Sequence, residues 1–314
     1  MPLHNSERDK NFIPRFDRRF IDSDEDFHWI GEGSYGGKAS GLAVIKKILS
    51  ENFNKEDFPD IQIFVPKMIV IRTNVFKAFM ERNNLYEFAF NEKNDIRIVN
   101  AFLQADLPVE ILGDLRSIIS NINSPLAIRS SSMLEDAKYE PFAGIYTTKM
   151  ISNNLPNIDA RFQKLIEAIK FVYASTYFKK SKDYFKVSSN SIEDEQMAVI
   201  IQEVVGKNHN NRFYPHISGV ARSYNFYAIG KSKPEQGTVS LALGLGKTIV
   251  DGGIGWNYCP IYTKSVPPYG DPQNMLKYTQ TTFWTVNMNP IVSYDPTKDT
   301  EYLTLCNLND AEYD

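Results

Sequence analysis

The sequence contains little cysteine, and Cys259 and Cys306 are the two present among 314 residues. Two thiols cannot form a disulfide framework and leave no metal-binding pattern, which favours a reducing compartment, and we predict a cytoplasmic protein. The sequence also lacks any apolar run near the roughly 18 to 20 residues that a membrane-spanning helix needs. The charged N-terminus contains no apolar signal core, so no secretory signal is predicted.

An excess of positive charge is also absent, because 35 Lys and Arg residues face 38 Asp and Glu residues. A formal net charge of −3 gives no global positive field, so we predict neither nucleic acid nor an anionic membrane as a partner. The apolar share of 42% and the charged share of 23% are typical of a globular protein of one or two domains. The histidines lie in no catalytic context and are predicted to be surface or packing residues: His4, His28, His209 and His216.

The most informative stretch is residues 126–144, LAIRSSSMLEDAKYEPFAG. It begins with an apolar run that predicts the end of a buried strand, followed by Arg129 and three serines. The spacing from Ser132 to Glu135 matches a capping box, which predicts a short helix, and a small-residue loop ends at Gly144. A guanidinium beside hydroxyls and backbone donors suits a bound phosphate. An arginine salt bridge next to an ordinary helix cap explains the same residues without a ligand.

A second glycine-rich stretch, GEGSYGGK at residues 31–38, lies between a predicted strand at 27–30 and a predicted helix at 39–49. Lys38 is at the start of that helix, where the macrodipole disfavours a cation. The placement is more understandable if an anion lies there as well, because helix N-termini collect phosphates. The alternative is that Lys38 is one solvated lysine among many.

Three generic motifs fit this loop poorly. The dinucleotide fingerprint is satisfied at residues 31–36, but the next strand lacks a clean acidic residue at its end. A protein kinase would need downstream Val-Ala-Ile-Lys and His-Arg-Asp segments, and neither is found. A Walker A loop fails because Ala39 follows Lys38 and Glu32 occupies the place of the first glycine. The segment at residues 246–248 is a similar near miss, because Leu241 occupies its first glycine position.

Several segments together resemble one family. IRSSSMLED at residues 128–136, followed by FAG at 142–144, resembles the VRSSA-x-x-ED…FAG signature of the N-terminal nucleotide-binding domain of phosphoenolpyruvate synthase and pyruvate phosphate dikinase. GGKASGLA at 36–43 resembles the GGKGA-x-LA motif of that family, and MAVIIQEVVG at 197–206 resembles MAV-x-VQ-x-MV. GLGKTIVDGG at 244–253 resembles GLGE-x-VVSG. Four motifs in the family's order, over roughly residues 30 to 255, are far more specific than any one of them.

Two positions depart from the family pattern. Lys247 replaces the usual glutamate, which leaves the role of that position open, and the turn that begins at Arg222 differs from the family's TRNP-like turn. The late Q-D-I-E-W-like strand, which supplies magnesium-binding carboxylates in the family, has no equivalent before Asp314. We therefore interpret the chain as a fragment that ends before the metal-binding strand, or as a degenerate relative, and its metal ligands stay unassigned.

The resemblance implies an α+β fold of the ATP-grasp type, with two lobes that close on ATP. The resulting domain prediction comprises an N-terminal arm, a first lobe, a second lobe and a proline-rich extension, at residues 1–26, 27–130, 131–258 and 259–314 respectively.

The resemblance also implies the binding residues, with ATP and Mg²⁺ as cofactors. Lys38 and Arg129 would be the catalytic residues and would hold the phosphates, and Gly144 would let its loop cover them. The adenine end would be lined by residues at the end of the strand that begins at Met197. The predicted set is Gly36, Gly37, Lys38, Arg129, Ser130, Gly144, Gln202, Glu203 and Val205.

The implied function is transfer of phosphate from ATP, through a phosphohistidine in a domain outside this chain, to pyruvate. On this reading the fragment alone is inactive, and its partners are ATP and a small acceptor reached through the missing domains. A second enzyme hypothesis keeps the ATP-binding domain but uses another acceptor, as in rifampin phosphotransferases and glucan dikinases. A third hypothesis is a nucleotide-binding module without catalysis, and Lys247 and the absent carboxylates agree with it.

Overall fold

A computed structural model describes residues 13–18, 27–134, 144–228, 230–263, 271–290 and 295–311 of the protein, without the side chains at 55, 275 and 276. The chain forms two compact units, which we describe separately. The first comprises Met1–Val204 and Val292–Glu301, and the second comprises Val205–Ile291 and Tyr302–Asp314. Both combine helices with sheets, which confirms the predicted α+β class.

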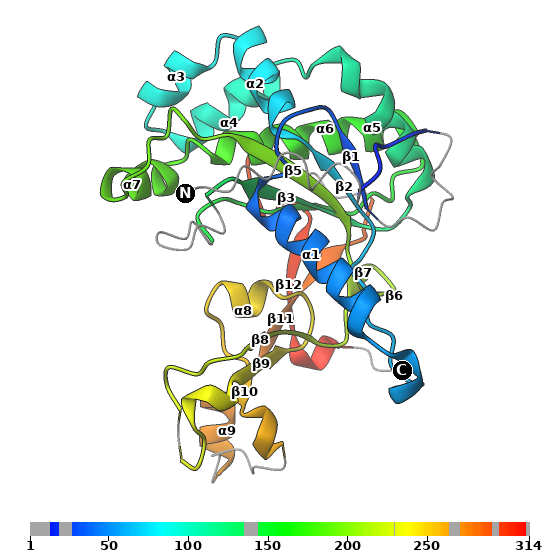
Figure 1. Ribbon diagram of the computed structural model, residues 1–314, viewed down its shortest axis with the longest axis vertical. Coiled ribbons are helices and arrows are strands. Elements are labelled where there is room, and N and C mark those ends of the chain that lie inside the picture. The colour runs from blue at the N-terminus through cyan, green and yellow to red at the C-terminus, as the bar shows by residue number, and fades with distance from the viewer. Residues whose placement is uncertain are drawn as a thin grey trace. The chain divides into compact units, whose positions relative to one another are not determined.

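The first unit is built on a five-stranded mixed sheet (Figure 1). Its first two neighbouring strands are parallel, and every other pair is antiparallel. Five of the seven residues of the central strand are apolar and six are buried, as expected for a strand buried on both faces. In spatial order the strands are β1 Phe27–Ile30, β2 Met68–Ile71, β5 Met197–Glu203, β3 Leu126–Ser132 and β4 Lys149–Ile151.

Helices cover both faces of this sheet. Because side chains alternate along a strand, the register places Arg129 and Ser131 on the same face as Ile200 and Ala198. Lys149 lies on the opposite face, where its ammonium is 4.5 Å from the ring centre of Phe171. The helices of this unit are α1 Gly36–Asn52, α2 Thr73–Arg82, α3 Tyr86–Asn91, α4 Asp95–Gln104, α5 Val109–Asn121, α6 Ile158–Ser175 and α7 Lys179–Val187, with a 3-10 turn at Lys55–Asp57.

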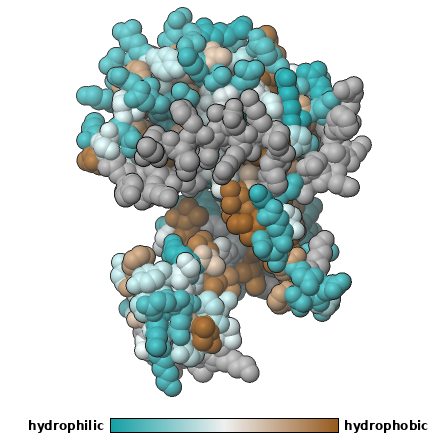
Figure 2. All heavy atoms as spheres, in the orientation of Figure 1, coloured by the Kyte–Doolittle hydropathy of each residue, from teal (hydrophilic) through white to brown (hydrophobic). Residues whose placement is uncertain are grey.

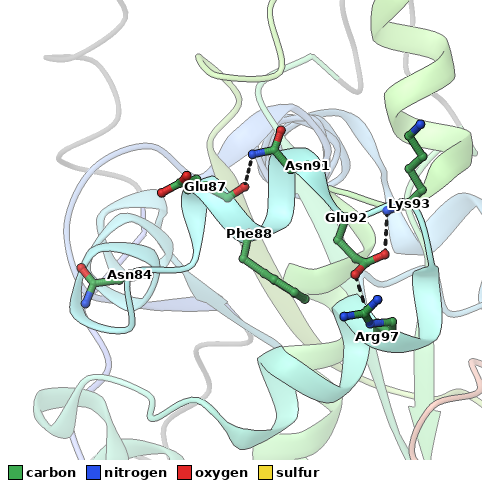
Figure 3. A pocket seen from close by; sticks show the side chains of 7 residues that line it. All are labelled: Asn84, Glu87, Phe88, Asn91, Glu92, Lys93 and Arg97. Atoms are coloured by element: carbon green, nitrogen blue, oxygen red, sulfur yellow. Dashed lines mark hydrogen bonds and ion pairs between the residues drawn. The ribbon is translucent and has the colours of Figure 1, made fainter.

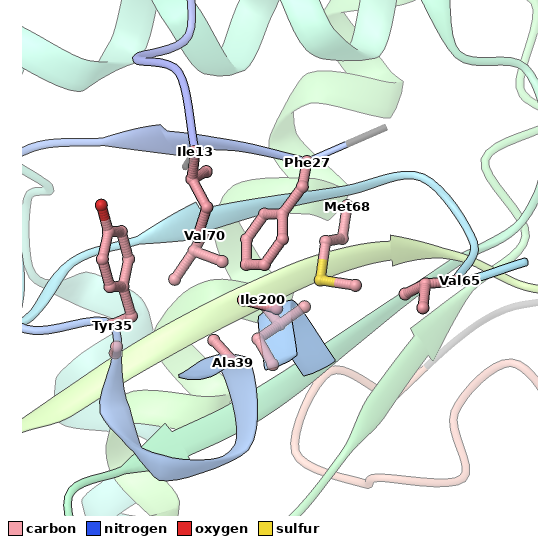
Figure 4. Packing of buried hydrophobic residues seen from close by; sticks show 10 residues of the cluster. Ile13, Phe27, Tyr35, Ala39, Val65, Met68, Val70 and Ile200 are labelled. Atoms are coloured by element: carbon pink, nitrogen blue, oxygen red, sulfur yellow. The ribbon is translucent and has the colours of Figure 1, made fainter. Parts of the chain in front are cut away.

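The helix α1 packs on the first of these faces through small residues. Ala39 and Ala43 belong to one buried cluster with Met68, Val70 and Ile200 of the sheet. Figure 4 shows Ala39 together with these three strand residues. Small side chains let a helix approach a sheet closely, so the start of α1 lies directly on β3. The outer surface of α1 remains partly apolar, and apolar side chains gather along it beside hydrophilic ones (Figure 2).

The helix α6 packs on the opposite face of the sheet. There, aromatic side chains of α2, α4 and α6 pack together in a buried core. Tyr173 is completely buried between Phe76 and Phe79, with ring centres 5.0 and 5.5 Å apart respectively. Rings at these distances and tilts contribute about 0.5–1.5 kcal/mol per pair beyond the area that they bury. This core fixes β3 and β5 from behind, so the strands that carry the predicted site residues are rigidly supported.

Buried or partly buried cations cap the C-terminal ends of three helices in this unit. Arg161 donates to the carbonyls of Ile119 and Ile122 at the end of α5, and its Nε donates to Asn153 at 2.9 Å. Lys170 donates to the last turn of α4, and Lys182 donates to the last turn of α3. These positions suit cations because the last carbonyls of a helix lack intrahelical partners and carry the negative end of its dipole.

Arg161→Met should therefore lower the free energy of unfolding by about 1–3 kcal/mol, because it leaves buried carbonyls without donors. Urea denaturation measures this change. Arg116→Met is the matched control, because Arg116 pairs with Asp159 at a site where both side chains are at least half exposed, and it should cost less than about 1 kcal/mol. An equal loss of unfolding free energy in the two variants would show that the Arg161 cap stabilises the protein no more than an exposed ion pair does.

A segment from near the end of the chain returns to the first unit and is fixed on β4. Lys149 forms an ion pair with Glu301 at 2.6 Å and donates to the carbonyl of Pro296 at 2.6 Å. Both charged side chains are 1% exposed. Burial lowers the pKa of Lys149 and raises the pKa of Glu301, while the attraction between the two charges opposes both shifts.

The second unit contains two antiparallel sheets. Tyr214, Phe283 and Cys306 form a buried cluster in the larger sheet. One sheet has the order β10 Trp256–Tyr258, β9 Thr238–Ala242 and β8 Ser218–Arg222, and the other has the order β12 Leu303–Asn307, β11 Thr282–Asn287, β7 Arg212–Tyr214 and β6 Lys207–His209. The described helical segments are α8 Lys247–Val250 and α9 Pro272–Tyr278, with 3-10 turns at Pro234–Gln236, Pro260–Tyr262 and Leu308–Asp310.

The compact units divide the chain at other places than the predicted lobes. The predicted boundary between residues 130 and 131 falls inside β3, which runs unbroken through the first unit because it pairs with β5 along its whole length. The chain enters the second unit at Val205, and part of the predicted extension 259–314 returns to the first unit. The lobe ranges stay a prediction about the nucleotide-binding domain.

Candidate functional site

The glycine loop brings the chain from β1 to the start of α1. Gly36, the first residue of α1, has φ +73° and lies directly against β3. A Cβ atom at this position would lie 1.7 Å from the carbonyl oxygen of Ser131, so neither the conformation nor the space accepts a side chain. The glycine therefore permits a close approach between the loop and the strand that carries Arg129.

Ser131 joins the same two segments by hydrogen bonds. Its hydroxyl donates to the carbonyl of Tyr35 at 2.8 Å and accepts from the backbone N–H of Ala39 at 3.0 Å. The side chain is completely buried. It thus satisfies one of the first N–H groups of α1, which lack partners within the helix.

Lys38 reaches β3 from the first turn of α1. Its ammonium donates to the carbonyl oxygen of Ser130 at 2.9 Å, and the hydroxyl of Ser130 lies 3.4 Å away. Ser130 directly follows Arg129 in β3, so the ammonium of Lys38 contacts the residue next to Arg129. The carbonyl and the hydroxyl of Ser130 are both neutral groups.

Arg129 extends over the face of the sheet that α1 covers. Its Nη1 donates to the side-chain oxygen of Gln202 at 2.8 Å. Gln202 is 7% exposed and lies on the same face, because its register partner is Ala127. The family resemblance implied that Gln202 lies at the adenine end of the site. The described contact instead joins this amide to a residue predicted to hold phosphates.

The remaining predicted site residues are Glu203, Gly144 and Val205. The carboxylate of Glu203 accepts from the hydroxyl of Ser124 at 2.6 Å. Gly144 is exposed with φ +74°, and its carbonyl accepts from the ammonium of Lys180 at 2.7 Å. Val205 is exposed and is the first residue of the second unit. The structure therefore groups Gly36, Gly37, Lys38, Arg129, Ser130 and Gln202 around the start of α1 and the neighbouring strands β3 and β5.

Sequence reasoning missed Ser131, although it selected the neighbouring Ser130. The available signal was the period of two along a strand, which places Ser131 rather than Ser130 on the same face as Arg129. The predicted capping helix after Ser132 lies outside the described residues from Glu135 onwards. The hydroxyl of Ser132 does accept from the N–H of Leu134 at 3.0 Å.

Lys247, which replaces the glutamate of the family motif, lies in the second unit. It forms an ion pair with Asp251 at 3.0 Å, and its ammonium is 5.7 Å from the ring centre of Trp284. The preceding loop packs on β11, where the N–H of Leu245 donates to the carbonyl of Trp284 at 2.9 Å. These contacts explain Lys247 by local structure, without a ligand.

An open pocket of about 610 Å³ lies elsewhere in the first unit, on the turns between α2, α3 and α4 (Figure 3). Two of its charged side chains, Glu92 and Arg97, make contacts within the local fold. Glu92 accepts from the N–H groups of Lys93 and Asn94, which lowers the pKa of this carboxyl group, and it pairs with Arg97 at 3.1 Å. None of the predicted site residues lines this pocket.

Neither a metal cluster nor a membrane span is found in the part of the chain that the structure describes. No group of three or more His, Cys, Asp or Glu side chains there could hold a metal ion. No helix there is both long and apolar enough to cross a bilayer.

Comparison with known proteins places the chain in a family. The profile described as "Pyruvate phosphate dikinase, AMP/ATP-binding domain" matches residues 32–267, a range that includes both Lys38 and Arg129. The uncharacterized phosphotransferase YvkC of Bacillus subtilis (strain 168) is 26% identical over 228 residues, which are 73% of this chain and 24% of that protein. The chain thus spans about a quarter of the length of this relative. Because the family profile covers most of the chain, this protein belongs to the family of the pyruvate phosphate dikinase AMP/ATP-binding domain.

Proposed function

We propose that this chain binds ATP and supplies the phosphate for a phosphotransferase. The family is described by its AMP/ATP-binding domain, and the relative from Bacillus subtilis is named a phosphotransferase. The observation that carries the proposal is the contact of the Lys38 ammonium with Ser130, the residue next to Arg129. A fixed ammonium and a guanidinium on adjoining segments match the several negative charges of a triphosphate.

The proposed role of both cations is electrostatic. Phosphoryl transfer leaves little covalent work for the protein, so positioning the phosphates and stabilising their charge account for most of the catalysis. Lys38 would contribute a point charge at the N-terminus of α1, where the helix dipole favours an anion. Arg129 would contribute a planar fork that can contact two phosphate oxygens at once.

The further steps of the proposal rest on the resemblance to the family. Phosphate would pass from ATP to a histidine in a domain outside this chain and then to pyruvate. Mg²⁺ would neutralise charge on the phosphates when bound. The described residues do not form a carboxylate site that fits Mg²⁺, so we assign no protein ligand to it and derive no step through it.

Equilibrium titration of this chain with ATP, ADP, AMP and adenosine tests the proposal. We expect ATP to bind more tightly than AMP, because two cations contact phosphates that AMP lacks. We also expect the difference to shrink as salt is added, because ions screen exposed charges. Equal affinity for ATP and adenosine, or no binding of ATP, would overturn the proposal. With the full-length protein, ATP consumption that yields phosphoenolpyruvate from pyruvate would identify the acceptor, whereas consumption without that product would point to another acceptor.

A further inference from the structure

We propose that Ser131 is a positioning residue, which holds the start of α1 against β3 so that Lys38 and Arg129 act on the same phosphates. This inference rests on the proposed function, because it concerns the same phosphate site. The sequence analysis named this serine only as one of three hydroxyls that follow Arg129. The inference depends on its hydrogen bonds, on its burial and on the close approach of Gly36.

The first step of the argument is that Ser131 joins the turn before α1 to the turn inside it. Its hydroxyl donates to Tyr35, the residue before the helix, and accepts from Ala39 in the first turn. One side chain thus fixes both sides of Lys38. Since the hydroxyl is completely buried, water cannot replace these bonds when they are lost.

The second step is that Ser131 is held in place by the sheet. It lies within β3 and pairs with Ala198 of the central strand β5. The same strand carries Arg129 two residues earlier, on the same face of the sheet. The position of the α1 start is therefore defined relative to Arg129 by a strand buried in the core.

The third step is that the backbones of Gly36 and Ser131 are in close contact. Gly36 approaches the carbonyl of Ser131 so closely that a single methyl group would overlap with it. Gly36→Ala should separate the same two segments from the opposite side. Two different substitutions, one that removes a bond and one that adds bulk, thus test a single interaction.

The expected result for Ser131→Ala is an ATP affinity roughly 5- to 30-fold weaker, as for the loss of two hydrogen bonds that fix geometry. Adenosine affinity should stay unchanged, because adenosine has no phosphate for the two cations. A serine that served stability alone would leave the ratio of ATP to adenosine affinity at its wild-type value. Gly36→Ala should lower that ratio in the same direction.

Ser175→Ala is the matched control. Ser175 is also completely buried, donates to the carbonyl of Val172 at 2.7 Å and accepts from the N–H of Thr147 at 3.3 Å. It belongs to α6, on the other face of the sheet. This variant should lose stability similar to that lost by Ser131→Ala while its ATP affinity stays at the wild-type value. A fall in ATP affinity equal to that of Ser131→Ala would overturn the positioning role.

Hydrogen exchange without nucleotide separates this inference from the proposed function. Exchange of the Ala39 amide should become at least about tenfold faster in Ser131→Ala than in the wild type, relative to amides of α6, because its acceptor is gone. If Lys38→Ala weakens ATP binding but Ser131→Ala changes neither the affinity ratio nor this exchange rate, the positioning role is wrong and the proposed function stands. If the wild type does not discriminate ATP from adenosine, the proposed function fails, and faster Ala39 exchange would still support the contact itself.

Discussion

Lys38→Ala and Arg129→Ala should each weaken ATP binding by about 1.5–3 kcal/mol, which is roughly a 10- to 150-fold increase in the dissociation constant. This is the range for a hydrogen bond to a charged group, and each variant removes one cation from the proposed phosphate site. Adenosine binding should change little in either variant. Calorimetric titration at one fixed ionic strength measures both effects.

The controls for these variants come from the same unit. Lys47 is on α1 as well, but its side chain is about half exposed and pairs with Glu51 at 3.8 Å. Arg97 is similarly exposed and pairs with Glu92. Lys47→Ala and Arg97→Ala should leave ATP affinity unchanged. Wild-type ATP affinity in both Lys38→Ala and Arg129→Ala would remove the phosphate assignment.

Lys149→Met should lower the free energy of unfolding of the first unit by about 3–5 kcal/mol, the largest stability effect that we expect. The substitution leaves the carboxylate of Glu301 buried without its cation and removes a donor from the carbonyl of Pro296. The double variant Lys149→Met with Glu301→Leu should lose less than the sum of the two single variants, because it leaves no unpaired charge in the interior. Urea denaturation of all three variants measures this difference.

Lys164→Met provides the comparison for a more exposed pair. Lys164 and Glu167 lie 2.8 Å apart on α6, with more than a quarter of each side chain exposed. Its loss should cost less than about 1 kcal/mol. If Lys149→Met costs no more than Lys164→Met, or if the double variant shows strictly additive losses, the buried pair does not fix the returning segment.

Local elements of this protein were largely predictable from sequence periodicity. The strand over 27–30, the glycine loop and the helix that follows it are present, and the apolar run that begins at Met197 forms β5. Such segments are specified by short-range patterns, because alternation and helical spacing are properties of neighbouring residues. The α+β class follows from their combination.

Hydroxyl contacts were less predictable. Thr73 begins α2, and threonine is a typical capping residue at a helix start, but its hydroxyl accepts from the N–H of Ser34 in the glycine loop at 2.9 Å, and α2 has no side-chain cap. The tertiary partner takes precedence here because the loop lies directly beside the start of α2. Ser131 was missed for the same reason, since its partners are 96 and 92 residues away in sequence.

The return of the chain to the first unit was also beyond sequence reasoning. The contact between Lys149 and Glu301 joins residues 152 positions apart, and neither residue lies in a motif. A lysine in a short strand and a glutamate near a turn are both ordinary surface residues by pattern. Their burial is decided by packing of the whole unit, which no local pattern describes.

The central claim is that Lys38 and Arg129 bind one polyphosphate. A crystal structure of this chain with a non-hydrolysable ATP analogue tests it most directly. We expect the Lys38 ammonium and the Arg129 guanidinium each within about 3.2 Å of phosphate oxygens of the same nucleotide. A nucleotide whose phosphates contact neither cation, with both side chains still bonded to Ser130 and Gln202 as described, would contradict the account.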